Sequence, residues 1–222
     1  MCARISTQAR RDRERQKRRN DILDAAERRF FENGFDEVSM EKIAEDLELS
    51  KTALYYHFKN KQSLFFAVVI RGIVILRDTF QKAVENETTG IKKILAIVQS
   101  FNEYLQSHSE YYQLNLAARG ERFTNMFENN QIKDLEAYIS LITELFDLLQ
   151  NAVTLGIEDG TLRKDLDPLQ TTIFLGVAIE AIVRVAPEYQ MLLHQSDLTT
   201  EEYIQHSIKV LLQGIAGEKA DI

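Results

Sequence analysis

The chain has 222 residues, 45% of them hydrophobic, with two prolines and nine glycines, and its formal net charge is −7. A chain of this length can bury a substantial core, and the scarcity of proline, glycine and alternating β-branched runs predicts an all-α fold of about nine helices. The single cysteine, Cys2, excludes an internal disulfide and fits a reducing compartment. No apolar run approaches the roughly 18 residues that a membrane span needs, so we expect a soluble, cytoplasmic protein without a membrane partner.

The first 19 residues form a basic arm. Residues 1–19 contain eight Lys or Arg against two acidic residues, whereas residues 65–222 contain 13 basic and 22 acidic side chains. A basic arm can neutralise DNA phosphates or enter a minor groove, although a solvated, disordered tail is the alternative. The acidity of the whole chain does not oppose DNA binding, because the positive charge is concentrated in one segment.

After this arm, the apolar spacing predicts two helices. The first carries its buried stripe through Phe30 and ends at Asn33 and Gly34, where glycine can adopt a left-handed conformation. The second is short and spans residues 40–47, with apolar residues at i, i+3, i+4 and i+7. Ser39 is its natural N-cap.

A third helix is predicted from Lys51 to Phe58, after a turn that ends at the N-cap Ser50. Only Leu54 and Phe58, four residues apart, point toward the core. The helix therefore displays hydroxyls, a small methyl group, aromatic rings and cations, a set that suits the major groove of DNA. The alternative is an ordinary amphipathic helix pair, which is common in soluble proteins.

The rest of the chain is predicted to be a helical body. The expected segments, in chain order, are a long helix at 61–85, a helix at 91–105, an irregular aromatic stretch at 111–127, a heptad-like helix at 132–153, a helix at 169–185 that Asp167 caps, and a last helix that starts with a capping box of Thr199 and Glu202 and runs to residue 215.

The helix at 169–185 is apolar on most of its sides, more than packing within one chain requires. A single recognition helix binds DNA weakly, and the usual solution is a two-fold dimer on a palindromic site. We therefore expect a homodimer. The alternative is a buried helix inside one monomer.

Aromatic and polar side chains mix in the middle of the chain, as in a small-molecule site, although core packing is the better explanation for any single aromatic residue. An arginine that lines such a site would favour an anionic or acyl-type ligand, and a surface ion pair is the other explanation. The candidate ligand-binding residues are Phe101, Tyr104, Tyr112, Arg119, Phe123, Phe127, Ile142 and Phe146. The sequence has no HExxH, GxGxxG, phosphate loop or Cys–His cluster, so we expect no enzyme, no catalytic residue, no metal and no cofactor.

The segment from Asn20 to Leu64 resembles the DNA-binding domain of the TetR-like (TetR/AcrR) family of transcriptional repressors. The resemblance rests on the order, spacing and residue types of ILDAAERRFFENGFDEVSMEKIAEDLELSKTALYYHFKNKQSLF. It implies a basic arm at 1–19, a three-helix head with a helix-turn-helix at 20–65, and a larger helical ligand-binding and dimerisation domain at 66–222.

Carried over by position, the resemblance implies base or backbone contacts with DNA from the recognition helix and its cap, and phosphate contacts from Ser39 and Lys61. The recognition-helix residues are Ser50, Lys51, Thr52, Ala53, Tyr55, Tyr56 and His57. The two tyrosines point about 100° apart on a helix, so we do not expect both to do the same work, and His57 is expected to cap or pack.

The resemblance also implies dimerisation through the last two helices and an inducer pocket among the middle ones. The candidate interface residues are Phe174, Val177, Ala181, Ile204, Ile208, Leu211 and Leu212. The function implied is a regulator, in most cases a repressor, that binds a palindromic operator in double-stranded DNA as a dimer and is released by a small-molecule inducer. A ligand-independent or architectural DNA-binding protein and a TetR-like activator are the alternatives.

Overall fold

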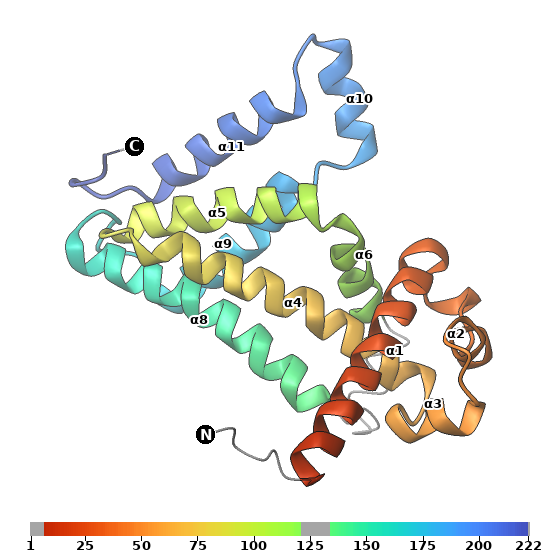
Figure 1. Ribbon diagram of the computed structural model, residues 1–222. Helices are drawn as coiled ribbons and strands as arrows, with labels where there is room; N and C mark the ends of the chain where they lie inside the picture. Colours follow the sequence, from red (N-terminus) through yellow and green to blue (C-terminus); the bar gives the residue numbers. More distant parts are fainter. Residues whose placement is uncertain (1–6, 121–133, 222) are drawn as a thin grey trace. The chain divides into compact units, whose positions relative to one another are not determined.

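The computed structural model describes residues 7–120 and 134–221, and within them the regular elements are helices, which confirms the predicted all-α class (Figure 1). Ten helices lie in these two ranges, and α10 is one that the sequence did not predict. The helices are α1 (Thr7–Glu37), α2 (Met40–Asp46), α3 (Lys51–His57), α4 (Lys61–Glu85), α5 (Gly90–Ser107), α6 (Ser109–Ala118), α8 (Leu135–Asp159), α9 (Pro168–Val183), α10 (Pro187–Gln195) and α11 (Thr200–Ile215).

The first helix begins earlier than predicted, because most of the basic arm is helical. Its first turns contain side-chain pairs four residues apart, the spacing that places two side chains side by side on a helix. Arg10 pairs with Glu14 at 2.9 Å, and the Gln16 amide donates to Asn20 at 3.1 Å. Gly34, with φ 69°, interrupts the helical backbone close to its end, where the sequence predicted a stop.

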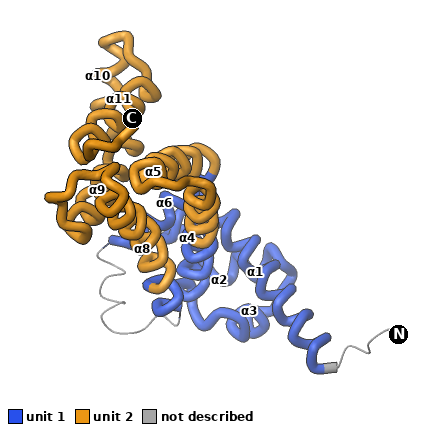
Figure 2. Tube along the Cα trace, turned by 90° about the vertical axis from the view of Figure 1, so that its left-hand side faces the viewer, with its two compact units in different colours: residues 1–73, 108–139 blue, residues 74–107, 140–222 orange. Residues whose placement is uncertain are grey.

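The chain divides into two compact units (Figure 2). Unit 1 comprises Met1–Ile73 and His108–Ile139, and unit 2 comprises Val74–Ser107 and Ser140–Ile222. Residues of α4 and α8 belong to both units. The domain boundary after residue 65 stays a prediction.

An aromatic cluster forms the core of unit 1. The Phe65 ring meets the Phe30 ring edge-on at 5.3 Å between centroids and the Phe35 ring at 5.0 Å. Phe66 continues the cluster at 5.8 Å from Phe65. Edge-to-face pairs of this kind contribute about 0.5–1.5 kcal/mol each beyond the area that they bury. They anchor the start of α4 against α1.

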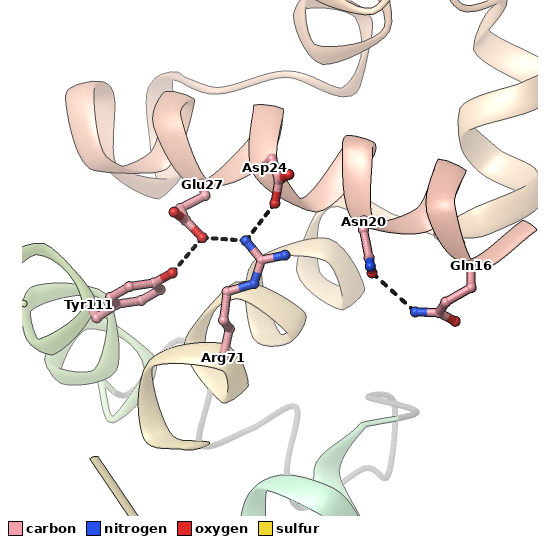
Figure 3. A network of polar contacts seen from close by, with 6 residues as sticks. All are labelled: Gln16, Asn20, Asp24, Glu27, Arg71 and Tyr111. Carbon is pink, nitrogen blue, oxygen red and sulfur yellow. Dashed lines mark hydrogen bonds and ion pairs between the residues drawn. The ribbon is translucent and has the colours of Figure 1, made fainter. Parts of the chain in front are cut away.

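A polar network joins three helices of unit 1 (Figure 3). The Arg71 guanidinium of α4 donates to the carboxylates of Asp24 and Glu27 of α1, at 2.7 Å each, and the Tyr111 hydroxyl of α6 donates to Glu27 at 2.6 Å. Burial raises the pKa of Tyr111, and the neighbouring Glu27 carboxylate raises it further. Gly72 allows the close approach of α6, because a Cβ there would lie 2.7 Å from the Cβ of Tyr111.

In unit 2, α5 and α8 approach closely through two glycines. A Cβ on Gly90 would collide with the backbone of Gly156. The Asp159 carboxylate accepts hydrogen bonds from the backbone N–H of Gly90 at 2.9 Å and of Thr161 at 2.8 Å. Burial alone would raise the pKa of Asp159, but the Thr161 hydroxyl, these two N–H groups and the Lys219 charge hold it below its ordinary value.

The starts of the last helices are confirmed. The Asp167 side chain accepts from the N–H of Gln170, and Pro168 occupies the first turn of α9. Thr199 and Glu202 form the predicted capping box at the start of α11. Over the described ranges, no single helix has the length and hydropathy of a membrane span, and only α9 and α10 taken together reach them, with a 59° bend between the two.

Candidate nucleic-acid interface

Two serine caps fix the helices of the candidate DNA-binding surface. The Ser39 hydroxyl accepts from the N–H of Lys42 at 3.2 Å, and the Ser50 hydroxyl accepts from the N–H of Ala53 at 3.2 Å. Between the two helices, Glu48 has φ 52°, a left-handed conformation that lets the chain turn within three residues. Both caps lie where the sequence predicted them.

The α3 helix has one buried side and one exposed side. Leu54 is fully buried and Phe58 is 2% exposed, whereas Lys51 and Thr52 lie on the surface. The tyrosines differ, as expected from their angular separation. Tyr55 is 39% exposed and Tyr56 is 68% exposed, so Tyr56 is the stronger candidate for a contact outside the protein.

Two of the predicted DNA-binding side chains, those of Lys51 and His57, have partners within unit 1. Lys51 pairs with Glu41 of α2, and the hydrogen bond to this carboxylate raises the pKa of Lys51. Both side chains are exposed, so solvent screens the pair and a DNA phosphate can replace the carboxylate. Ala53 and His57 are half-buried, and the His57 ring lies edge-on to the Tyr56 ring at 5.3 Å.

The imidazole of His57 is surrounded by positive charge. Burial lowers the pKa of His57, and the charges of Arg15, Arg19 and Arg18 lower it further. An imidazole with a lowered pKa is mostly neutral at pH 7, so it adds no charge to a phosphate contact.

Lys61 has partners within unit 1 that the sequence did not predict. Its ammonium group donates to the carbonyl oxygens of Phe35, Asp36 and Val38, at 2.7, 3.2 and 2.9 Å, and lies 4.2 Å from the centre of the Phe35 ring. An ammonium group has three N–H donors, and all three are used. Lys61 therefore holds the loop after α1, and its phosphate contact stays a prediction.

The sequence missed the contact between the basic start of α1 and the end of α3. The Arg15 guanidinium lies 5.3 Å from the centre of the Tyr56 ring, and Arg19 lies 4.1 Å from that of Phe58. The only signal for it was the spacing of Arg15 and Arg19, which puts both on one helix face.

The predicted ligand-binding residues fall in both units. Tyr112 and Arg119 belong to unit 1, and the other four that the structure describes belong to unit 2: Phe101, Tyr104, Ile142 and Phe146. Burial raises the pKa of Tyr104. Phe123 and Phe127 lie outside the described residues. The ligand site stays a prediction.

The predicted dimer residues of α9 are exposed, and those of α11 are only partly so. Phe174 is 56% exposed and Val177 is 67% exposed, with Ala181 also on the surface. Ile204 and Leu212 are buried at 5% and 2% exposure. The apolar stripe of α11 that carries them faces α5 of the same chain, and their part in a dimer interface stays a prediction.

The remaining α11 candidates, Ile208 and Leu211, are half-buried. Ile208 lines the groove between α5 and α11 together with Ile204 and Leu212, and Leu211 lies beside Val210 near α9. The large apolar side chain that α11 exposes is Val210, at 55%.

Within residues 7–120 and 134–221, no three His, Cys, Asp or Glu side chains come together in a way that could hold a metal ion.

Known proteins resemble the chain at the level of sequence and of fold. The family described as "Bacterial regulatory proteins, tetR family" matches residues 22–68. The HTH-type transcriptional activator FasR of Mycolicibacterium smegmatis is 28% identical over 142 residues, which cover 61% of this chain and 60% of FasR. The HTH-type transcriptional repressor KstR2 of Rhodococcus jostii is 30% identical over 158 residues, which cover 68% of this chain and 70% of KstR2.

The fold of a solved regulator is also similar. The transcriptional regulator FadR from Bacillus subtilis, in complex with stearoyl-CoA, superimposes with a TM-score of 0.66 at 17% identity, over 88% of this chain and 98% of FadR. At this level of sequence identity, the comparison with FadR shows a shared fold and nothing more. The helix-turn-helix match and the similarity to KstR2 over more than two thirds of its length lead to one assignment. The chain belongs to the tetR family of bacterial regulatory proteins.

Proposed function

We propose that this protein is a sequence-specific, DNA-binding transcriptional regulator that acts as a repressor in the cytoplasm, where the DNA lies. The observation that carries the proposal is the two-sided α3 helix, with Leu54 buried and Tyr56 68% exposed. Lys51, Thr52 and Tyr56 provide a cation, a methyl and hydroxyl group, and an aromatic hydroxyl on the exposed side. These groups can contact base edges and phosphates in a major groove.

A homodimer on a palindromic operator is the second part of the proposal. Exposed apolar side chains on α9, with Val210 on α11, support it. Large exposed apolar side chains that gather on neighbouring helices are typical of a protein interface. Two copies of α3, one from each protomer, would then bind successive turns of one duplex, about 34–36 Å apart.

Release by a small molecule is the third part. FadR was solved with stearoyl-CoA, and the middle of this chain contains buried aromatic side chains such as Phe101 and Tyr104. An apolar or acyl-type ligand fits such surroundings. We propose that the ligand shifts α4, residues of which belong to both units, and so changes the separation of the two recognition helices.

Two alternatives remain open. FasR is named as an activator, and activation of a promoter is therefore the first alternative to repression. An architectural DNA-binding protein would keep the α3 surface but would need neither an operator nor a ligand.

Selection of bound duplexes from a random pool, followed by footprinting on the enriched sequence, tests the proposal. We expect a palindromic footprint that a screen for apolar and acyl-type compounds can abolish. Uniform coverage of DNA would favour the architectural alternative. A ligand that binds the protein but leaves the operator affinity unchanged would contradict the proposed release.

A further inference from the structure

The basic start of α1 is helical from Thr7 onward and contacts the end of α3. Nη1 of Arg19 donates to the carbonyl oxygen of His57 at 3.1 Å, and the same guanidinium covers the Phe58 ring at 4.1 Å from its centre. The carbonyl groups in the last turn of a helix have no partner within that helix, and a cation there is favourable. Arg19 thus provides a hydrogen bond and a charge at the C-terminus of the recognition helix.

Arg15 lies one turn earlier on the same face of α1. Its guanidinium is 5.3 Å from the centre of the Tyr56 ring, the most exposed aromatic ring of α3. A guanidinium stacked on a ring presents its N–H donors at its edge, in the fork geometry that suits a phosphate group. Arg15 and the Tyr56 hydroxyl therefore lie together on the side of α3 that we propose faces DNA.

The charges around this contact are mostly positive. A surface hollow of about 430 Å³ lies between the start of α1 and the end of α3, and its lining includes Arg15, Arg19 and Lys59. Asp12 and Asp134 are its acidic residues. Burial lowers the pKa of His57 most, and the charges of Arg15, Arg19 and Arg18 lower it further.

We propose that the face of α1 that carries Arg15 and Arg19 is a second DNA-contacting element, in which Arg15, held against Tyr56, contacts a phosphate and Arg19 is a positioning residue for α3. This inference rests on the proposed function. A preformed helix differs from a disordered arm, because it requires no ordering when it binds and it places its charges at fixed positions relative to α3.

The salt dependence of DNA binding tests the role of Arg15. The probe is the duplex that the wild-type protein enriches from a random pool. Arg15→Gln should weaken binding and reduce the slope of log K against log salt by about 0.9, the effect of one phosphate contact. Arg13→Gln is the matched control. It removes the same charge about 200° around the helix, so affinity and slope should stay as in the wild type.

Arg19→Gln tests the positioning role. We expect a loss of about tenfold in affinity for the enriched duplex, the effect of one charged hydrogen bond, with an unchanged salt slope. The ratio of affinities for the enriched and a shuffled duplex should fall, because a displaced α3 loses base contacts. Arg19→Lys should recover part of the ratio, because an ammonium group can also donate to the His57 carbonyl.

The outcomes separate this inference from the proposed function. If the wild type enriches no sequence, the proposed function is wrong. If the wild type binds its duplex but Arg15→Gln and Arg19→Gln behave like Arg13→Gln, only the inference is wrong. A salt slope lowered by Arg19→Gln would overturn its positioning role. Circular dichroism checks folding, and if Arg19→Gln is unfolded, Arg19→Lys and Arg15→Gln decide the test.

Discussion

Successive residues of α3 have very different surroundings. Leu54 is fully buried, Tyr55 is 39% exposed and Tyr56 is 68% exposed, because each residue turns about 100° around a helix axis. One short helix can therefore separate the side chains that hold it in place from those that are available to DNA. Substitutions at neighbouring positions should then affect different properties.

Tyr56→Ala should weaken binding to the enriched duplex by about tenfold or more, since a hydrogen bond to a charged group contributes about 1.5–3 kcal/mol. Its free energy of unfolding should change by no more than about 0.5 kcal/mol, as for most surface substitutions. Fluorescence anisotropy with labelled DNA and thermal denaturation measure the two effects. Equal losses of stability and of DNA binding would instead assign Tyr56 a packing role.

Leu54→Ala is the matched substitution on the buried side. It should lower the free energy of unfolding by about 2–5 kcal/mol, because it leaves a cavity in the core. DNA binding should then fall only to the extent that the protein unfolds.

Asp159 makes stability depend on pH. Its folded pKa is below the unfolded value, of about 3.9, so its carboxylate stabilises the fold at every pH above the unfolded pKa, and this contribution is lost as the pH falls through the folded pKa. Asp159→Asn should therefore be less stable than the wild type at pH 7, and the difference should narrow below pH 4. Urea denaturation across this pH range measures it.

The exposed Asp147 of α8 provides the control for this measurement. Asp147→Asn should leave the free energy of unfolding close to that of the wild type at pH 7. If the free energy of unfolding that Asp159→Asn loses stays constant down to the lowest pH, the substitution destabilises the protein for a reason other than the lost charge.

At the scale of elements, two glycines set the distance between α5 and α8. Gly90→Ala should lower the free energy of unfolding by about 1–3 kcal/mol, because its Cβ would overlap the backbone at Gly156, and backbone yields less than a side chain. Thermal denaturation gives the value. In Gly214→Ala, the added Cβ meets no atom within 4 Å, so the free energy should instead rise by about 0.5–1 kcal/mol. Equal effects at the two positions would contradict the close approach of the helices.

The sequence predicted well what depends on neighbouring residues. The N-caps Ser39, Ser50 and Asp167 were found because a cap depends on residues two or three positions away. Apolar spacing likewise identified Leu54 and Phe58 as the buried residues of α3.

The sequence did not predict contacts between residues that are far apart along the chain. Lys61 bonds carbonyls more than 20 residues away, and Arg19 bonds the carbonyl of His57, 38 residues away. Spacing also shows that Ile204 and Leu212 are buried, but it cannot tell a helix of the same chain from a helix of a partner. The α10 helix was missed for another reason. It contains no buried residue, so no apolar stripe marked it in the sequence.

For the whole molecule, the exposed apolar side chains of α9 allow a test with closely matched positions. Ile173 of α9 and Ile139 of α8 are each 53% exposed. Ile173→Asp should convert the dimer to a monomer, since it places a charge in an apolar interface, and operator affinity should fall with it. Ile139→Asp should remain dimeric.

Light scattering coupled to size-exclusion chromatography gives the mass of each variant, and circular dichroism confirms the fold. If the wild type is monomeric, or if both variants remain dimers, the proposed α9 interface is wrong. DNA binding by a monomeric Ile173→Asp protein at wild-type affinity would contradict the link between dimer and operator.

The helical start of α1 also determines how a protease meets this protein. Residues 10–19 contain seven Lys or Arg, each a cleavage site for trypsin. A protease requires locally extended backbone, so a stable helix is cut slowly in spite of this density of sites. The rate at which trypsin cleaves this segment is therefore a direct measure of how often the N-terminal turns of α1 unwind.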